Sequence, residues 1–304
     1  MFKPVACLLS LLIAFAIPAA AQERTTIGIG RLFNNDALGD QDDRWRTGSY
    51  ALSWVRGPVW TGQMPVKPGA LLEFRAFSEV VAPSNLASPG LPDRRYAGVL
   101  SFGVHTHFRL GSADARVGGT LVLVGPQTGL AGFQEAVHRA FGLPLPNTAN
   151  QFGNAAYPML SAESGRDLAL GSNVTFRPFI EAQLGFETLA RVGADVTFGH
   201  YGRGALLLRD IVTGQRYMGV RPPGGGESGV SFTIGGDFAR VGKSELLPAG
   251  GTAVLANSRS RLRAGLDWHG GSTEVFYGVT WLSKEFEAQG SGQLVGSLHA
   301  RIRF

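Results

Sequence analysis

The sequence predicts an all-β fold: a twelve-stranded antiparallel transmembrane β-barrel with a short helix in an extracellular loop. Three observations lead to this prediction. The chain begins with an export signal, later segments alternate between apolar and polar residues, and no later apolar run reaches the ~18 residues that a spanning helix needs. We therefore expect residues 1–21 to be a signal peptide and residues 22–304 to form one barrel in the outer membrane of a Gram-negative bacterium.

The N-terminal segment has the three parts of a secretory signal. Lys3 supplies the positive charge, residues 7–20 are almost uninterruptedly apolar, and Ala19, Ala20 and Ala21 form a small-residue cleavage site. Cys7 is the only cysteine and lies inside the apolar stretch, which argues against a lipoprotein anchor. The mature chain is thus expected to fold without disulfides.

The composition agrees with strands that are polar on one face. The chain has 43 glycines and 44% hydrophobic residues, yet its mean hydropathy is only +0.06. The formal charge is +5, and it becomes +4 when Lys3 leaves with the signal. This mild excess suits an anionic or phosphorylated surface, but it is too small and dispersed to indicate nucleic-acid binding.

Alternation with a period of two residues is clearest at the C-terminus. One face of that segment carries Leu294, Gly296, Leu298, Ala300, Ile302 and Phe304, and the other carries Val295, Ser297, His299, Arg301 and Arg303. Such alternation over ten or more residues suits a strand that crosses a bilayer at a tilt. A soluble β-sandwich is the alternative, but it would not usually need so many uniformly long strands. The terminal Phe304 also indicates a partner, the barrel-assembly machinery.

The same pattern predicts twelve strands, taken here in chain order. They cover residues 25–33, 47–56, 69–81, 96–109, 114–125, 156–169, 174–188, 190–200, 229–242, 258–269, 272–285 and 290–304. An even count places both termini in the periplasm, so the connections 34–46, 82–95 and 126–155 face outward. Residues 201–228 make a long connection on the side where turns should be short, and a missed strand pair there stays an open alternative.

Charged residues of both signs fall on the face that should line the lumen. They are Glu73, Arg75, Glu79, Arg177, Glu181, Glu187, Arg301 and Arg303. Mixed charges can pair across a barrel of this size and fill it, and this interpretation is favoured over a transport path. The sequence therefore does not indicate a porin.

Three segments in the outward connections stand out. The first joins residues 33–36 to 42–48, the second is 92–98, and the third joins 124–126 to 134–139. In order and spacing they resemble the signature stretches of the outer-membrane lipid A 3′-O-deacylase family. Residues 240–241 and 283–286 match as well, so the resemblance spans the mature chain.

The resemblance implies a twelve-stranded barrel that hydrolyses an ester-linked acyl chain, at the 3′ position, of the lipid A of lipopolysaccharide. It implies calcium as cofactor, with a histidine that activates water and a metal ion that polarises the ester carbonyl. Carried over by motif, the catalytic residues are His138, Thr47, Asn35 and Asp36, and Asp36 is the metal ligand.

The chemistry of these residues allows the roles but does not require them. His138 lies in a predicted helix, Leu130–Phe141, at the edge of an apolar stripe that we expect to face the barrel rim. A neutral imidazole suits a general base, although a lone histidine on such a helix is often an ordinary surface residue. Asp36 offers the oxygen donor that calcium takes, and Asn35 could add a carbonyl, but both also suit a plain turn. Thr47 could orient His138 or simply open a strand.

Further candidates are weaker. Loop arginines could bind the phosphates of lipid A or act as general anchors; these are Arg44, Arg94, Arg95 and Arg139. His105 and His107 lie two residues apart on one face and could ligate a metal, but no partner recurs nearby.

The chain departs from the family pattern at two places. The family has an acidic residue six positions after the histidine, where this chain has Pro144, and its Tyr-Thr-Asn-Gly element is reduced here to Arg46, Thr47 and Gly48. Calcium would then rely on Asp36 with help from Glu135, Asp40, Asp42 or backbone carbonyls. A non-catalytic barrel of the same family and a small-solute channel remain the alternative functions.

Overall fold

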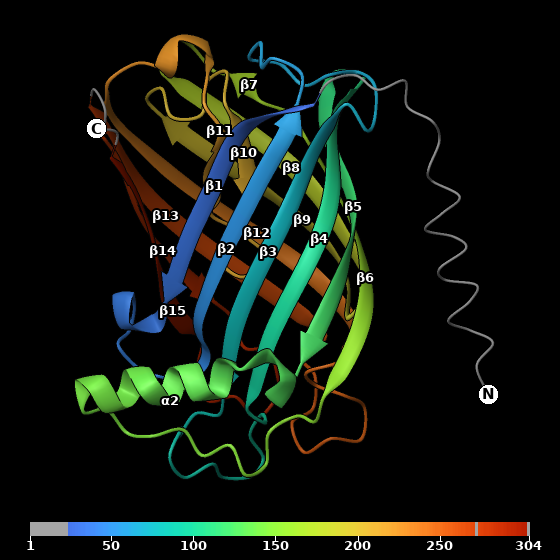
Figure 1. Cartoon of the computed structure of the whole chain (residues 1–304), viewed down its shortest axis with the longest axis vertical. Coiled ribbons are helices and arrows are strands. Elements are labelled where there is room, and N and C mark those ends of the chain that lie inside the picture. The colour runs from blue at the N-terminus through green and yellow to red at the C-terminus, as the bar shows by residue number, and fades with distance from the viewer. Residues whose placement is uncertain (1–23, 271–272, 303–304) are drawn as a thin grey trace, which may run out of the picture.

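The computed structural model describes residues 24–270 and 273–302. The predicted signal peptide lies outside this range. The described chain forms a closed antiparallel barrel (Figure 1). Its twelve long strands are β1 (Thr25–Asn35), β2 (Trp45–Gly57), β3 (Leu71–Ala82), β4 (Ala97–Leu110), β5 (Ala113–Val124), β6 (Ala155–Gly165), β8 (Val174–Gly185), β9 (Glu187–Phe198), β12 (Gly229–Ser244), β13 (Ser258–Gly270), β14 (Thr273–Leu282) and β15 (Gln293–Ile302). All twelve predicted strands are confirmed, with ends that differ by a few residues.

Each long strand pairs with its neighbours in the sheet, and two pairings close the barrel. β1 pairs with β15, for example Phe33 with Leu298, and β6 pairs with β8, for example Ala162 with Ala182. The short strand β7 (Leu168–Ala169) only extends the sheet beside β8. No helix among the described residues is long and apolar enough to cross a membrane.

The outer face of the wall is apolar and exposed, as the alternation predicts. Exposed side chains on this face include Phe33, Trp54, Phe102, Leu184 and Leu262. In a protein that met only water, such a continuous apolar surface would be unfavourable. It is the surface that a barrel presents to lipid.

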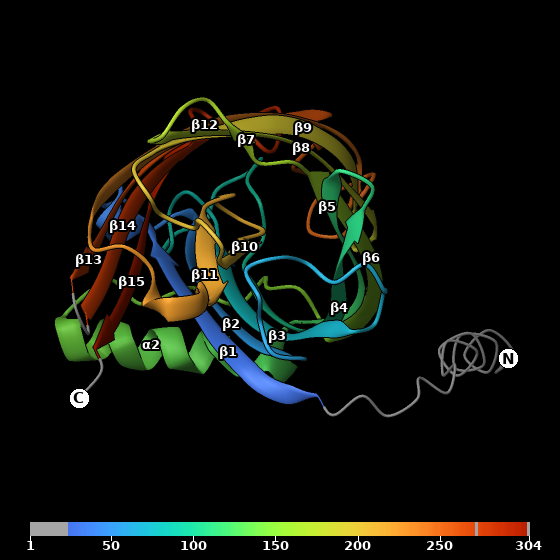
Figure 2. The same cartoon turned by 90° about the horizontal axis from the view of Figure 1, so that it is seen from above.

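Residues 201–228 do contain a pair of strands, which was the open alternative for this segment. β10 (Leu206–Arg209) and β11 (Arg216–Val220) form a hairpin that lies inside the barrel, as the view along the barrel shows (Figure 2). Leu206, Leu208 and Tyr217 of this hairpin pack against inward side chains of β1, β2, β3 and β14. A strand of four or five residues is too short to span a bilayer, which is why the periodicity did not distinguish it from a loop.

The rest of the lumen is filled with ion pairs, as expected from the mixed charges. Glu73 accepts from Arg75 at 2.6 Å, Arg177 pairs with Asp167 at 3.1 Å, and Arg263 pairs with Asp195 at 2.5 Å. Arg303 lies outside the described residues. The hairpin and these pairs therefore both occupy the lumen.

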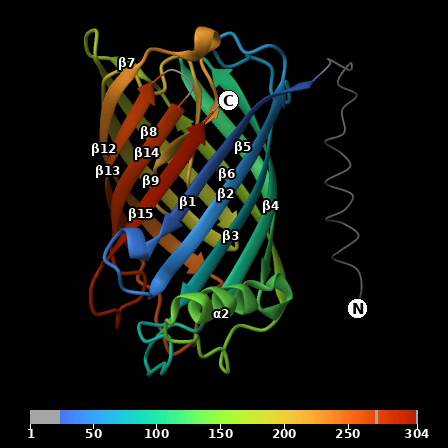
Figure 3. The ribbon, with the colours of Figure 1, turned by 60° about the vertical axis from the view of Figure 1, so that its left-hand side comes forward.

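The functional candidates lie at the opposite end of the barrel from the end where β1 begins and β15 ends. Three helical elements are found there: η1 (Asp36–Leu38), η2 (Pro126–Thr128) and α2 (Leu130–Phe141). α2 has the predicted bounds and lies outside the wall, across the ends of β3 and β4 (Figure 3). Gly98 of β4 allows the close approach, because a Cβ there would stand 2.5 Å from Thr128 Oγ1 and 3.1 Å from Leu130 Cβ.

Candidate functional site

A β-bulge in β2 positions Thr47. Arg46 pairs with Val81 and Gly48 with Val80, so Thr47 is an extra residue without a partner in the ladder. Arg46 points into the lumen, where it binds Glu79 and Glu285 at 2.7 Å each. A bulge changes the side-chain direction of the residue it adds. Thr47 therefore faces out of the barrel, and its hydroxyl donates a hydrogen bond to Asp43.

Asn35 and Asp36 lie where β1 leaves the wall. The side-chain oxygen of Asn35 accepts from the backbone N–H of Ala37 at 2.8 Å and caps η1. Asn35 pairs with Gly48 across the ladder, and a Cβ on Gly48 would approach its Nδ2 to 3.0 Å. Asp36 is buried and accepts from the backbone N–H of Arg44 at 3.0 Å.

The electrostatic environment of Asp36 is unfavourable for a bare carboxylate. The pKa of Asp36 is raised to about 8, mainly because the carboxyl group is buried and also because the carboxylates of Asp43 and Asp40 lie nearby. The N–H of Arg44 and the hydroxyl of Thr47 act in the opposite direction. A carboxyl group in such surroundings becomes ionised when a cation compensates it.

α2 brings its polar side chains to this cluster. Gln134 and His138 are one turn apart and are the buried residues of the helix. His138 Nε2 lies 3.0 Å from Asp43 Oδ2, and Gln134 Nε2 donates to Asp43 Oδ1 at 3.4 Å. Asp43 therefore joins His138, Thr47 and Gln134 at one point outside the barrel wall.

The position of Pro144 explains how His138 is held. The helix ends at Gly142, and the chain turns back so that the carbonyl oxygen of Pro144 lies 2.6 Å from His138 Nδ1. This contact places the Nδ1 proton on the bond to the carbonyl and directs Nε2 toward Asp43 and Thr47. The residue at the family's acidic position thus contributes its backbone oxygen, not its side chain.

Two residues of this cluster were not among the sequence candidates. Asp43 lies in the first of the three segments that resemble the family, and Gln134 lies in the third. The sequence alone assigns a function to neither residue. The spacing of Gln134 and His138 by four residues was the available signal for one shared helix face. Asp43 could not be selected over Asp40 and Asp42 without the fold.

Comparisons with known proteins show the family and the fold. The family model described as outer membrane protein LpxR matches residues 6–304. The chain belongs to the LpxR family. Among solved structures, LpxR from Salmonella typhimurium has a TM-score of 0.76 and 17% identity, covering 91% of this chain and 100% of that one. A search of curated proteins returns no match.

More distant barrels share less with this LpxR-family protein. The β domain of the Bordetella autotransporter BrkA has a TM-score of 0.45 and 11% identity, covering 91% of this chain and 99% of that one. The translocator domain of NalP from Neisseria meningitidis has a TM-score of 0.43 and 10% identity, covering 99% of this chain and 97% of that one. The family match places this barrel in the outer membrane.

The predicted arginines differ in accessibility in this LpxR-family chain. Arg94 is buried and pairs with Glu285, so it does not occupy the exposed position that binding a lipid phosphate requires. Arg44 pairs with Asp40 and Asp42 at 3.2 Å each. Arg95 donates to two backbone carbonyls at 2.6 and 3.0 Å, and Arg139 pairs with Glu135 on the exposed side of α2. Arg95 and Arg139 are the exposed ones among the four.

The donors around Asp36 have the chemistry that calcium takes. Carboxylate oxygens of Asp36 and Asp43, the Thr47 hydroxyl and the amide of Gln134 lie in one cluster, and Gln134 Oε1 is buried without a partner in the described chain. Within residues 24–270 and 273–302, however, no three His, Cys, Asp or Glu side chains are arranged to hold a metal ion. Hydroxyl, amide or water oxygens would have to complete the coordination. The expectation that no partner lies near His105 and His107 was wrong, because the carboxylate of Glu73 lies 2.8 Å from His107 Nε2. Among the described residues these three side chains nevertheless do not form a group that could hold a metal ion.

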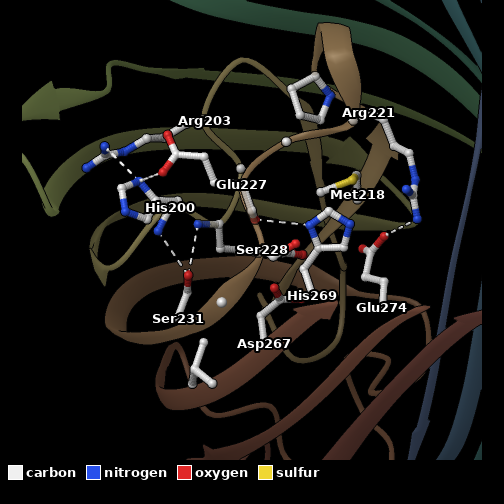
Figure 4. A pocket seen from close by; sticks show the side chains of 17 residues that line it. His200, Arg203, Met218, Arg221, Glu227, Ser228, Ser231, Asp267, His269 and Glu274 are labelled. Carbon is white, nitrogen blue, oxygen red and sulfur yellow. Dashed lines mark hydrogen bonds and ion pairs between the residues drawn. The ribbon is translucent and has the colours of Figure 1, made fainter. Parts of the chain in front are cut away.

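A second polar cavity lies near the internal hairpin, at the other end of the barrel (Figure 4). His200 pairs with Glu227 at 3.3 Å and Arg221 with Glu274 at 2.9 Å, whereas Oδ2 of Asp267 is buried there without a hydrogen-bond partner in the described chain. Its volume of about 40 Å³ has room for a few water molecules. It contains none of the predicted site residues. We interpret it as a space between the side chains that close this end of the barrel.

Proposed function

We propose that this protein is an outer-membrane lipid A deacylase that hydrolyses an ester-linked acyl chain, at the 3′ position by resemblance to its family. The observation that carries the proposal is the place of the His138–Asp43–Thr47 cluster. Asn35 and Gly48 pair on the outer wall, and the next outward pair along the same two strands is Phe33 with Tyr50, both exposed. The cluster therefore lies just above the lipid-facing aromatic side chains, at the level of a lipid headgroup.

His138 acts as the general base in this proposal. Its Nδ1 is held by Pro144, and Nε2 accepts a proton from the water that attacks the ester carbonyl. As the acyl–oxygen bond breaks, the same nitrogen returns the proton to the departing sugar oxygen. In the present arrangement Asp43 occupies the space in front of Nε2, and its side chain, 35% exposed, has room to turn aside for the water.

Asp43 and Thr47 position the base. An anion close to Nε2 stabilises the imidazolium that forms when His138 takes the proton. Thr47 fixes the other carboxylate oxygen of Asp43. When bound by Asp36, Asp43, Thr47 and Gln134, calcium would supply a positive charge for the developing oxyanion.

A solute channel is disfavoured by the filled lumen. The internal hairpin packs its apolar residues against the inner wall, and ion pairs occupy the remaining inner face. These side chains occupy part of the space that a transport path would need.

The deciding experiment is mass spectrometry of lipid A from cells that express the wild type or His138→Asn. The wild type should convert lipid A to a species that lacks one acyl chain. His138→Asn should fold and lose about 10²–10⁴-fold of this activity. His269→Asn, in the cavity at the other end, is the matched control and should retain it. Unmodified lipid A with the folded wild type would favour the non-catalytic alternative.

A further inference from the structure

α2 buries two of its polar side chains and exposes two of its aromatic ones. Gln134 and His138 are 7% and 5% exposed, whereas Phe133 and Phe141 are 65% and 76% exposed. The sequence led us to expect that the apolar stripe would face the barrel rim. That expectation was wrong, because the functional cluster outside the wall takes up the polar face of the helix.

The helix has three distinct faces. At 100° per residue, Gln134 and His138 form the face toward the wall. Glu135 and Arg139 lie on one side of it and form an exposed ion pair. Leu130, Phe133, Val137 and Phe141 lie on the other side, and we call them the apolar flank. The exposed side chains of Leu143 and Leu145 follow the helix.

The apolar flank is continuous with the lipid-facing wall. Leu130 lies against Gly98 on the outward row of β4. The same row continues with Leu100, Phe102 and Val104, of which Phe102 and Val104 are about half exposed. A helix with charged and apolar sides that runs along a membrane surface buries its apolar side at the boundary between headgroups and acyl chains.

We propose that α2 is an interfacial helix whose apolar flank inserts among the acyl chains of the outer leaflet. Glu135 and Arg139 then face the headgroups and water, and the leaflet itself forms the open side of the site. Building on the proposed function, a lipid substrate reaches His138 sideways from the leaflet and never passes through the lumen.

The position of the flank can be measured without reference to activity. In a Cys7→Ser background the chain has no other cysteine, so single cysteines at Phe133, Phe141 or Arg139 can carry an environment-sensitive fluorophore. The labelled proteins are reconstituted in phosphatidylcholine vesicles that contain a lipid with a nitroxide quencher on its acyl chain. Phe102→Cys on the lipid-facing wall serves as the membrane reference.

Labels at Phe133 and Phe141 should be quenched as strongly as the label at Phe102, and at least twofold more than the label at Arg139. Iodide in the aqueous phase should give the reverse order. Equal quenching at Phe133, Phe141 and Arg139, in protein whose unboiled form migrates as a folded barrel, would overturn the proposal.

The catalytic consequence needs a second comparison. Phe133→Ser with Phe141→Ser should reduce deacylation of lipopolysaccharide in membranes at least tenfold more than deacylation of lipid A in detergent micelles. Equal losses in the two settings would contradict sideways access from the leaflet. If the labels were strongly quenched by lipid but the wild type never deacylated lipid A, the interfacial position of α2 would be supported and the proposed function refuted.

Discussion

Replacing Asp43 by Asn tests the positioning of the base most directly. The carboxylate of Asp43 lies 3.0 Å from His138 Nε2 and accepts the hydroxyl of Thr47. Asn is nearly isosteric and keeps an oxygen for Thr47. Its amide group, however, donates to Nε2 and stabilises the neutral imidazole, so the protonated ring that forms during the reaction loses its anionic partner.

The size of the effect follows from the exposure of this pair. Hydrogen bonds to charged groups contribute about 1.5–3 kcal/mol. The Asp43 side chain is 35% exposed, and solvent screening favours the lower part of that range, about 1.5–2 kcal/mol. Because 1.36 kcal/mol corresponds to a tenfold change in rate, we expect kcat to fall about 10–30-fold. KM should change little, since Asp43 contacts the base and not the acyl chain.

The assay is the release of fatty acid from purified lipid A in detergent, followed over a range of substrate concentrations. Asp42→Asn is the matched control, because Asp42 is adjacent in sequence, 61% exposed and bonded to Arg44 rather than to His138. It should keep its kcat within twofold. If Asp43→Asn also kept the wild-type kcat, the role of Asp43 in positioning His138 would be refuted.

Three further predictions concern the metal, the proline and the hairpin. Asp36→Ala should lower deacylation at least about tenfold, chelation should do the same to the wild type, and added calcium should restore only the wild type. Pro144→Glu restores the family's acidic residue and should shift the calcium titration of activity to lower concentration; identical curves would mean that the missing ligand is supplied elsewhere or not needed. Replacing residues 207–219 by a short glycine–serine linker should raise single-channel conductance above that of the closed wild type, and an unchanged conductance would show that the ion pairs alone close the lumen.

The barrel could be predicted from local pattern alone. In the strand that ends at Ile302, the alternation of polar and apolar residues predicts which side of the wall each side chain faces, because successive side chains of a strand point to opposite faces. Val295 is an exception, since it is apolar and yet buried inside the barrel. The β10–β11 hairpin could not be predicted in this way. Leu206 and Leu208 belong to a strand too short for its period to be recognised, and their burial depends on inner-wall residues contributed by strands far away in the sequence.

For the candidate site, too, some residues could be predicted from the sequence and others needed the tertiary structure. His138, Thr47, Asn35 and Asp36 were proposed from motif order, and the structure brings them to one end of the barrel. The sequence cannot single out Asp43, because Asp40 and Asp42 carry the same side chain a few residues away. Only the bulge at Thr47 and the docking of α2 distinguish Asp43 from these two residues.

By itself, then, the sequence determined the class of this protein, the twelve strands, the bounds of α2 and the residue types of the site, because these follow from side-chain polarity and spacing along the chain. Only the tertiary structure decided which face of α2 meets the wall. The helix contains both a polar and an apolar side, and each could in principle pack inward. The choice depends on the carboxylate and hydroxyl groups that β1, β2 and their connection present outside the barrel, and on Pro144, whose carbonyl returns to His138. Those groups come together only when the wall has closed.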